Sequence, residues 1–227
     1  MKISPHPQGS NDWLMARVGI PTASEFAAFM VEQKTEKAKE AYRKYILRKI
    51  TETFPKDEFE IQADERARSY LDKDPWIQRG NALEPEARRV LAKKLGKDIV
   101  ESGLIFHDGG GFAASPDGLV VSDDGETWEA GVEIKCHNLM RHLSDYLDGV
   151  LPDDHKHQVH GSMAVTGLSQ WHYFGYYPNQ PCLHLIVERD DFTDRLEAGL
   201  KTLVAEKAKM KAELARLWKS EFGEVKP

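Results

Sequence analysis

Four short segments of the sequence carry side chains that could act together on a phosphodiester. The segments are RGNALEPEAR, SPDG, VEIKC and HKHQVHGSM, and their residues of interest are Glu84, Asp117, Glu133, Lys135 and Gln158. Three carboxylates can hold a hard divalent cation, and a lysine beside them can orient a water molecule against phosphorus. This chemistry is typical of metal-dependent nucleases, and no other set of residues in the chain competes with it.

The VEIKC segment predicts a strand that displays two charged groups on one face. Side chains alternate along a strand, so Glu133 and Lys135 point the same way. The apolar residues around them point into the core, and these are Val132, Ile134 and Cys136. A charge on a buried strand needs a partner, because unpaired buried charge is costly. For this segment alone, an edge strand with both charges in solvent is the plainer alternative.

The SPDG segment is predicted to place an aspartate beside that strand. Pro116 fixes one φ angle and Gly118 permits a sharp turn, so Asp117 is held at the start of a strand. The residues that follow predict a hairpin with Asp124-Gly125 near its tip. Pairing of its two strands brings Asp117 close to the glutamate of the Glu-x-Lys motif. A turn without a function is the alternative, and the spacing to Glu-x-Lys favours the site.

The ligand types predict the metal. Carboxylate oxygens select hard ions, so we expect Mg²⁺, with Mn²⁺ as a substitute. Asp117 and Glu133 are the expected direct ligands, and the carbonyl oxygen of Ile134 is a further candidate. Lys135 is expected to orient or help deprotonate the attacking water and to offset charge at the phosphate. Glu84 is expected to bind the metal directly, through water, or with a second ion.

A histidine cluster offers a different metal site. His155, His157 and His160 are spaced i, i+2, i+5. Two zinc ligands on one helix usually stand at i and i+4, as in the HExxH motif. We therefore do not expect zinc at these histidines.

The elements that must position these residues change in type along the chain. Thr22 to Glu25 forms a capping box that opens a short helix. Helical spacing of apolar residues predicts helices over about 38–50 and 80–95. Short β-rich segments and further helices follow, with strands near 99–106, 111–114, 118–122, 131–136, 171–177 and 183–188, and helices near 139–148, 153–166 and 191–221. We predict one domain, 1–227, with a core over about 9–190, of the α/β (α+β) class, in which a central mixed sheet is flanked by helices.

The composition indicates an ordinary globular protein. Of 227 residues, 41% are hydrophobic and 30% are charged, and the two cysteines are far apart. No run approaches the roughly 20 apolar residues of a membrane span, so we expect a cytoplasmic protein without a membrane partner. The net charge of −6 is low for a protein that binds nucleic acid. Basic residues nevertheless gather in 34–49 and 88–97, each of which is either a phosphate contact or a solvated helix face.

The ordered motifs resemble the PD-(D/E)xK nuclease superfamily and, more narrowly, the phage lambda exonuclease family of viral recombination alkaline exonucleases. The resemblance spans about residues 9–190 and rests on GSNDWLMARVGIPTASE, RGNALEPEAR, AASPDGLV, GVEIKC and HQVHGSM. It implies a restriction-endonuclease-like core. The resemblance implies that the metal ligands are Asp117, Glu133 and the Ile134 carbonyl, and that the catalytic lysine is Lys135. Glu84 and Gln158 match a supporting acid and glutamine.

The resemblance also implies a reaction and its partners. It implies a magnesium-dependent exonuclease that degrades one strand of double-stranded DNA 5′→3′ to mononucleotides and leaves a 3′ overhang for recombination by strand annealing. Such families form a homotrimeric ring, and a single-strand annealing protein takes the product; the setting is a phage or prophage protein in a bacterial host. Arg17, Ser24 and Ser115 match positions that line a 5′-phosphate pocket. An arginine can contact phosphate through two N–H groups, and a helix start such as that at Ser24 favours an anion.

Three other functions account for parts of the pattern. A structure-specific or restriction-type DNA endonuclease would share the metal core without a 5′-phosphate pocket, and it would cut closed circular duplex. A non-catalytic DNA-binding recombination scaffold would carry a relic site, against which the intact Asp117, Glu133 and Lys135 argue. A phosphohydrolase of small substrates would leave the TASE and basic segments unexplained.

Overall fold

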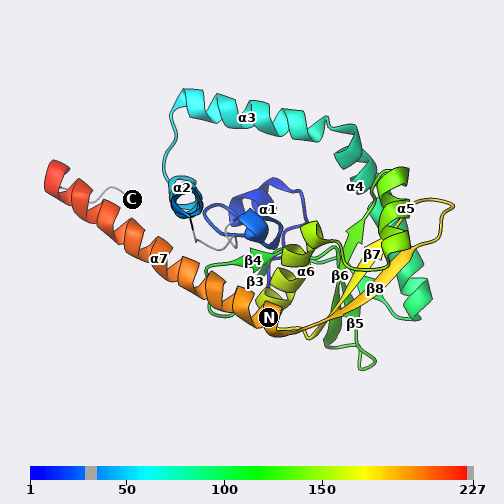
Figure 1. The fold of residues 1–227 in the computed structure, drawn as a ribbon. Coiled ribbons are helices and arrows are strands. Elements are labelled where there is room, and N and C mark those ends of the chain that lie inside the picture. Colours follow the sequence, from blue (N-terminus) through cyan, green and yellow to red (C-terminus); the bar gives the residue numbers. More distant parts are fainter. Residues whose placement is uncertain (29–34, 224–227) are drawn as a thin grey trace.

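The centre of the molecule is a mixed five-stranded sheet with helices on both faces (Figure 1). The computed structural model describes residues 1–28 and 35–223. The strand order is β2-β5-β6-β7-β8, with bounds Ile99–Val100, Gly118–Val121, Trp128–Lys135, Gln170–Gly175 and Leu183–Glu188. Strands β6 and β7 run parallel, whereas the other neighbours are antiparallel. The predicted α/β class with a central mixed sheet is confirmed.

Strands β5 and β6 form the hairpin that the sequence predicts. Gly118 pairs with Val132. At the tip, Asp124 Oδ1 accepts two backbone N–H groups at 2.8 and 3.0 Å, and Gly125 has a φ of +72°. This positive φ suits glycine, which explains why Asp-Gly marks the turn. The register places Asp117 directly beside the middle of β6.

The two faces of the sheet are covered by different helices. Helix α4 (Pro75–Leu95) packs Ala87 and Leu91 onto one face, where they meet apolar residues of three strands, Val120, Ala130, Val132, Ile134 and Phe174. Helix α6 (Asp153–Thr166) packs Val159 and Met163 onto the other face, against Trp171 and Tyr173 of β7. Because side chains alternate along β6, its charged residues share this second face. The alternation predicted for VEIKC is observed.

A second core joins the two ends of the chain. Helix α2 (Glu36–Thr51) packs against α7 (Asp191–Phe222), the long helix that leaves the body of the molecule in Figure 1. Fully buried Leu196, Leu200 and Leu203 of α7 share a cluster with Ile46 and Ile50 of α2. The C-terminal helix expected at about 191–221 is therefore observed. Among the described residues, no helix is long and apolar enough to cross a membrane.

The segment 99–106, expected as one strand, is divided between two sheets. Strand β2 ends at Val100, and β3 (Ile105–Phe106) joins a smaller sheet with β1 (Lys2–Ile3) and β4 (Ala113–Ala114). The Ser4 N–H donates to the Leu104 carbonyl at 2.7 Å, so the N-terminal strand draws this stretch away from β2. This contact joins segments a hundred residues apart, so the sequence pattern around 99–106 did not indicate it.

The helices before the sheet also differ from the expectation. Helix α3 (Glu58–Asp72) was not predicted, because it lacks an apolar stripe that faces a core, and Phe59 and Tyr70 are exposed. Helix α4 begins at Pro75 rather than near 80, because Asp74 caps it by accepting the Trp76 N–H at 2.8 Å. In the basic segment 34–49, Lys34 lies outside the described residues, and most of the other cations lie on the exposed side of α2.

The N-terminal elements rest against α6. Helix α1 (Asn11–Ala16) is followed by η1 (Ala23–Ala28), which is a 3₁₀ helix rather than an α-helix. Phe26 of η1 is fully buried, and it lies where Gly161 of α6 has no side chain. A Cβ at position 161 would stand 2.3 Å from Phe26 Cδ2. This close approach fixes η1 on the helix that also carries Gln158.

Candidate active site

Asp117 and Glu133 meet where β5 and β6 begin to pair. Pro116 and Asp117 precede β5, and the Asp117 N–H donates to the Val132 carbonyl at 3.0 Å. In return, Asp117 Oδ2 accepts the Ile134 N–H at 2.7 Å. This second bond aims the aspartate across the strand. Asp117 is 8% exposed and Glu133 is 1% exposed, so two carboxylates are buried side by side.

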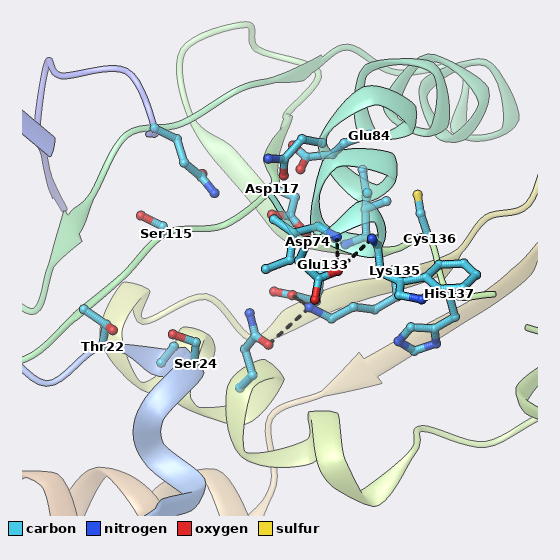
Figure 2. Close-up of a pocket in the computed structure, with 18 of the residues that line it drawn as sticks. Thr22, Ser24, Asp74, Glu84, Ser115, Asp117, Glu133, Lys135, Cys136 and His137 are labelled. Atoms are coloured by element: carbon cyan, nitrogen blue, oxygen red, sulfur yellow. Dashed lines mark hydrogen bonds and ion pairs between the residues drawn. The ribbon is translucent and has the colours of Figure 1, made fainter. Parts of the chain in front are cut away.

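Lys135 links the glutamate to helix α6. Its Nζ lies 2.5 Å from Glu133 Oε1 and donates to Gln158 Oε1 at 3.3 Å (Figure 2). Strand alternation and the packing of α6 together produce this cluster. The other oxygen of the glutamate, Glu133 Oε2, is buried and has no hydrogen-bond partner among the described residues.

The buried cluster has strongly shifted acid–base properties. Burial raises the pKa of Glu133 to about 8, since Lys135 only partly offsets it and Asp117 adds repulsion. Burial likewise raises the pKa of Asp117, against the effect of Lys135 and the Ile134 N–H. Burial disfavours the charged form of Lys135, but the carboxylates of Glu133 and Asp117 outweigh it and raise its pKa. When ionised, these carboxylates together carry more negative charge than Lys135 neutralises, and the raised pKa values reflect this.

Glu84 approaches this cluster from α4 but is engaged by a different partner. Its Oε1 accepts from Arg88 Nη2 at 2.5 Å. Arg88 Nε donates to the Asp117 carbonyl at 2.7 Å, and Arg88 Nη1 approaches Glu101 at 3.4 Å. Burial and the nearby Asp117 raise the pKa of Glu84 to about 7. Arg88 thus ties the helix carboxylate to the backbone of the aspartate.

The residues present suit a hard divalent cation. Buried carboxylates with raised pKa values, and an oxygen of Glu133 that has no hydrogen-bond partner among the described residues, fit a cationic partner. Across residues 1–28 and 35–223, no three His, Cys, Asp or Glu side chains are grouped to hold an ion by themselves. Asp117 and Glu133 supply two carboxylates, so a third oxygen has to come from a backbone carbonyl or from Glu84 after it leaves Arg88.

A second group of polar residues lies on the other side of the same cavity. The Trp13 indole N–H donates to Ser115 Oγ at 3.0 Å, and the Arg17 guanidinium lies 4.2 Å from the centre of the Trp13 ring. Arg17 Nη2 donates to Thr22 Oγ1 at 2.9 Å. Burial lowers the pKa of Arg17, and Glu25 opposes this effect. Ser24 is exposed on η1 (Figure 2).

All nine predicted site residues line one cavity of about 570 Å³: Arg17, Ser24, Glu84, Ser115, Asp117, Glu133, Ile134, Lys135 and Gln158. Figure 2 shows Thr22, Ser24 and Ser115 on one side of this cavity, away from Glu133 and Lys135. The arrangement can hold an anion at one end and a metal with a water at the other. Because η1 has only six residues, the anion end rests on the side chains and not on a helix dipole.

Several contacts in the cavity could not be read from the motifs. Arg88 stands four residues after Glu84, and this spacing of opposite charges on a helix was the signal that could have identified the pair. Trp13 reaches Ser115 across 102 positions of sequence, and nothing local indicates that contact. Thr22 was expected to cap its helix. Its hydroxyl instead accepts from Arg17, although Glu25 does accept the Thr22 N–H at 3.2 Å.

The three histidines of α6 contact different partners. His155 Nε2 lies 3.3 Å from His137 Nε2, His157 meets the ring of Phe192, and His160 Nδ1 lies 2.7 Å from Thr193 Oγ1. They do not converge on a common point among the described residues.

Comparisons with known proteins agree with this geometry. Residues 12–169 match the family model described as a YqaJ-like viral recombinase domain. The alkaline exonuclease LHK-Exo from Laribacter hongkongensis is 29% identical, with a TM-score of 0.68 over 93% of this chain and 98% of that one. Its complex with dAMP gives a TM-score of 0.67 at the same identity and coverage. A phage-related exonuclease from Haemophilus somnus shares the fold, at 12% identity and a TM-score of 0.52 over 86% of this chain and 96% of that one. No curated protein matches the sequence.

Proposed function

The chain belongs to the YqaJ-like viral recombinase family, and from this premise we propose that it is a metal-dependent exonuclease that digests one strand of linear double-stranded DNA from its 5′ end. The family and enzyme class predicted from the sequence, a phage-type exonuclease and hence a hydrolase, are confirmed. One observation carries the finer proposal. A buried carboxylate–lysine cluster and an arginine–serine group suited to phosphate share a single cavity.

Mg²⁺, with Mn²⁺ as a substitute, is the proposed cofactor. Asp117, Glu133 and the Ile134 carbonyl would hold the ion, and Glu84 would contact it directly or through water. Bound there, the ion supplies Lewis acidity at the phosphate and lowers the pKa of a water. The raised pKa of Lys135 keeps its ammonium charged, so it can orient the water and stabilise charge that develops on the phosphate oxygens. Gln158 positions that ammonium through its amide oxygen.

The proposed hydrolysis breaks the bond between phosphorus and the 3′ oxygen of the terminal nucleotide. The water oxygen forms the new bond to phosphorus and its proton passes to solvent, while the 3′ oxygen takes up a proton from solvent and leaves as a hydroxyl. The cleaved phosphate stays on the next nucleotide, so each cycle generates a new 5′-phosphate. Arg17, Ser24 and Ser115 would hold that group, because a guanidinium and hydroxyls are strong donors to phosphate. The strand is thus consumed in the 5′→3′ direction and a 3′ overhang remains.

Digestion of defined duplexes tests this function. Linear duplexes with 5′-phosphate or 5′-hydroxyl ends, each labelled throughout one strand, are incubated with Mg²⁺ or with EDTA, and a closed circular duplex serves as the control. We expect mononucleotides from the phosphorylated linear duplex with Mg²⁺, slower digestion of the hydroxyl duplex, and no digestion in EDTA. Cutting of the circular duplex would instead indicate the endonuclease alternative.

A ring of three subunits and a single-strand annealing protein are the proposed partners beyond DNA. The part of the chain described here has apolar side chains in solvent on two separate helices. Phe59 and Tyr70 of α3 are 81% and 80% exposed, and Met140 and Leu147 of α5 (Leu139–Asp148) are 81% and 82% exposed. Two different apolar faces on one chain support head-to-tail contacts that close into a ring. Sedimentation of the protein tests this, and a monomer at micromolar concentration would contradict it.

A further inference from the structure

A buried network of ion pairs is connected to Arg17 through hydrogen bonds. Lys49 of α2 is 5% exposed, and its Nζ lies 2.9 Å from Glu25 Oε2 and 3.2 Å from Glu52 Oε2. None of these three residues lines the candidate active site. Burial of an ammonium is costly unless its partners are well placed. Lys49 is too buried to serve solubility, so its charge calls for a structural role.

A hydroxyl connects this network to Arg17. Arg17 Nη2 donates to Thr22 Oγ1 at 2.9 Å. Because an arginine can only donate, the hydroxyl must accept this bond, and its own proton is left to donate to Glu25 Oε2 at 3.4 Å. Thr22 is itself buried. Each bond therefore has one possible donor: Arg17 donates to Thr22, and Thr22 and Lys49 both donate to Glu25.

The same network also holds Gly19, inside the Arg17–Thr22 loop. Glu52 Oε2, the second partner of Lys49, accepts the Gly19 N–H at 3.0 Å. Gly19 has a φ of +72°, and a Cβ there would stand 2.5 Å from Thr53 Cγ2 and 3.1 Å from the Lys49 carbonyl oxygen. The loop is thus docked closely on the end of α2. A change at Lys49 can therefore reach Arg17 through Thr22, by way of Glu25, and through Gly19, by way of Glu52.

We propose that Glu25 and Lys49 are positioning residues that orient Arg17 toward the 5′-phosphate through the Thr22 hydroxyl, an inference that rests on the proposed function. Glu25 turns the lone pairs of the Thr22 oxygen toward the guanidinium. This contact fixes one edge of Arg17 and leaves its other donors for the phosphate. Lys49 neutralises Glu25 together with Arg48, whose Nη2 lies 3.0 Å from Glu25 Oε1, so the carboxylate does not repel the phosphate that Arg17 must hold. Lys49 is the buried one of the two cations and holds the oxygen that Thr22 contacts.

Paired substitutions on two substrates test this assignment. KM and kcat are measured with 5′-phosphorylated and 5′-hydroxyl linear duplexes for Thr22→Val, Thr22→Ser and Lys49→Met. The matched control is Lys44→Met, which removes an exposed lysine of the same helix that pairs with Glu40 at 2.7 Å. We expect Thr22→Val to raise KM about tenfold for the phosphorylated duplex, the loss expected for one charge-assisted contact, with KM for the hydroxyl duplex nearly unchanged. Lys49→Met should act in the same direction, and Thr22→Ser and Lys44→Met should behave as the wild type.

The outcomes separate this inference from the proposed function. An equal loss on both duplexes would mean that the network only attaches η1 to α2, and it would overturn the inference. If Lys49→Met fails to fold, the two Thr22 variants decide. Arg17→Ala is the reference. If it abolishes the preference for 5′-phosphate while Thr22→Val keeps that preference, the positioning role alone is wrong. If Arg17→Ala leaves the preference intact, the 5′-phosphate pocket is wrong and the positioning role with it.

Discussion

Replacement of Glu133 by glutamine tests the electrostatics of the site without DNA. The Glu133 side chain is 1% exposed, and burial raises its pKa to about 8. In the unfolded chain it ionises near the usual glutamate value of about 4.3. Between these two pH values the folded protein keeps a proton that the unfolded chain has lost. The associated stability is therefore complete below pH 4.3 and is lost as pH rises through 8.

The size of the effect follows from the shift. Between pH 6 and pH 8 the metal-free protein should lose about 2 kcal/mol through Glu133, because each pKa unit corresponds to about 1.36 kcal/mol. In a protein of this size, 1 kcal/mol moves the melting temperature by about 2–4 °C. The wild type should therefore lose about 4–8 °C more than Glu133→Gln over this interval. Glu84 titrates in both proteins, so the difference reports on Glu133.

Calorimetric melts in EDTA at pH 6 and pH 8 measure this difference. Glu126→Gln, at an exposed position of the same hairpin, is the matched control and should follow the wild type. Added Mn²⁺ should raise the melting temperature of the wild type at pH 8 and leave Glu133→Gln nearly unchanged, because an ion that binds only the folded state stabilises it. Parallel pH dependence of wild type and Glu133→Gln would refute the reasoning, since it would mean that the Glu133 charge is already satisfied.

Lys135→Ala should lower kcat about 10²- to 10³-fold, because electrostatic stabilisation is lost. A filter-binding assay should show that the variant still binds DNA ends. Turnover near that of the wild type would exclude Lys135 from the mechanism. Asp117→Ala should weaken Mn²⁺ binding in a calorimetric titration. In EDTA, relieved repulsion among the carboxylates should offset the stability lost with the bond to the Ile134 N–H, so the melting temperature should change little. Unchanged Mn²⁺ affinity would contradict its assignment as a ligand. Arg17→Ala should slow digestion of 5′-phosphorylated duplex about 10- to 150-fold more than that of 5′-hydroxyl duplex, as measured by release of mononucleotides; equal slowing would mark a general backbone contact.

The cluster of Asp117, Glu133 and Lys135 could be predicted because its geometry is local. Asp-Gly specifies the turn between β5 and β6, and strand alternation then places Glu133 and Lys135 on one face. Asp117 follows from the same hairpin register, since it stands one residue before the pair Gly118–Val132. Short-range backbone rules therefore suffice to bring these three side chains together. Their roles remain predictions until the variants are measured.

What could not be predicted depends on contacts between distant segments. Trp13 and Ser115 meet only in the folded protein, and so do Glu25 and Lys49 of the network behind Arg17. Helix α3 was missed because it has few contacts with the rest of the protein rather than because its contacts are distant in sequence. Its side chains are almost all exposed, so its helicity leaves no apolar period in the sequence. The position of Glu84 in the cavity was predicted, but its bond to Arg88 was not. Ordinary ion pairs on helix surfaces have the same four-residue spacing, so the spacing alone does not distinguish this pair.

The packing of Phe26 into the space beside Gly161 has a consequence for the size of the product. It joins the element that bears Ser24 to the helix that bears Gln158, with no room for a side chain between them. The end that would grip the terminal phosphate and the end that would cut therefore cannot slide apart by a nucleotide's length. In the proposed reaction this fixed separation sets the distance between the terminal phosphate and the bond that is cut. In that reaction every cut would be measured from the strand's own end, whatever the base sequence, and each product would have the same length.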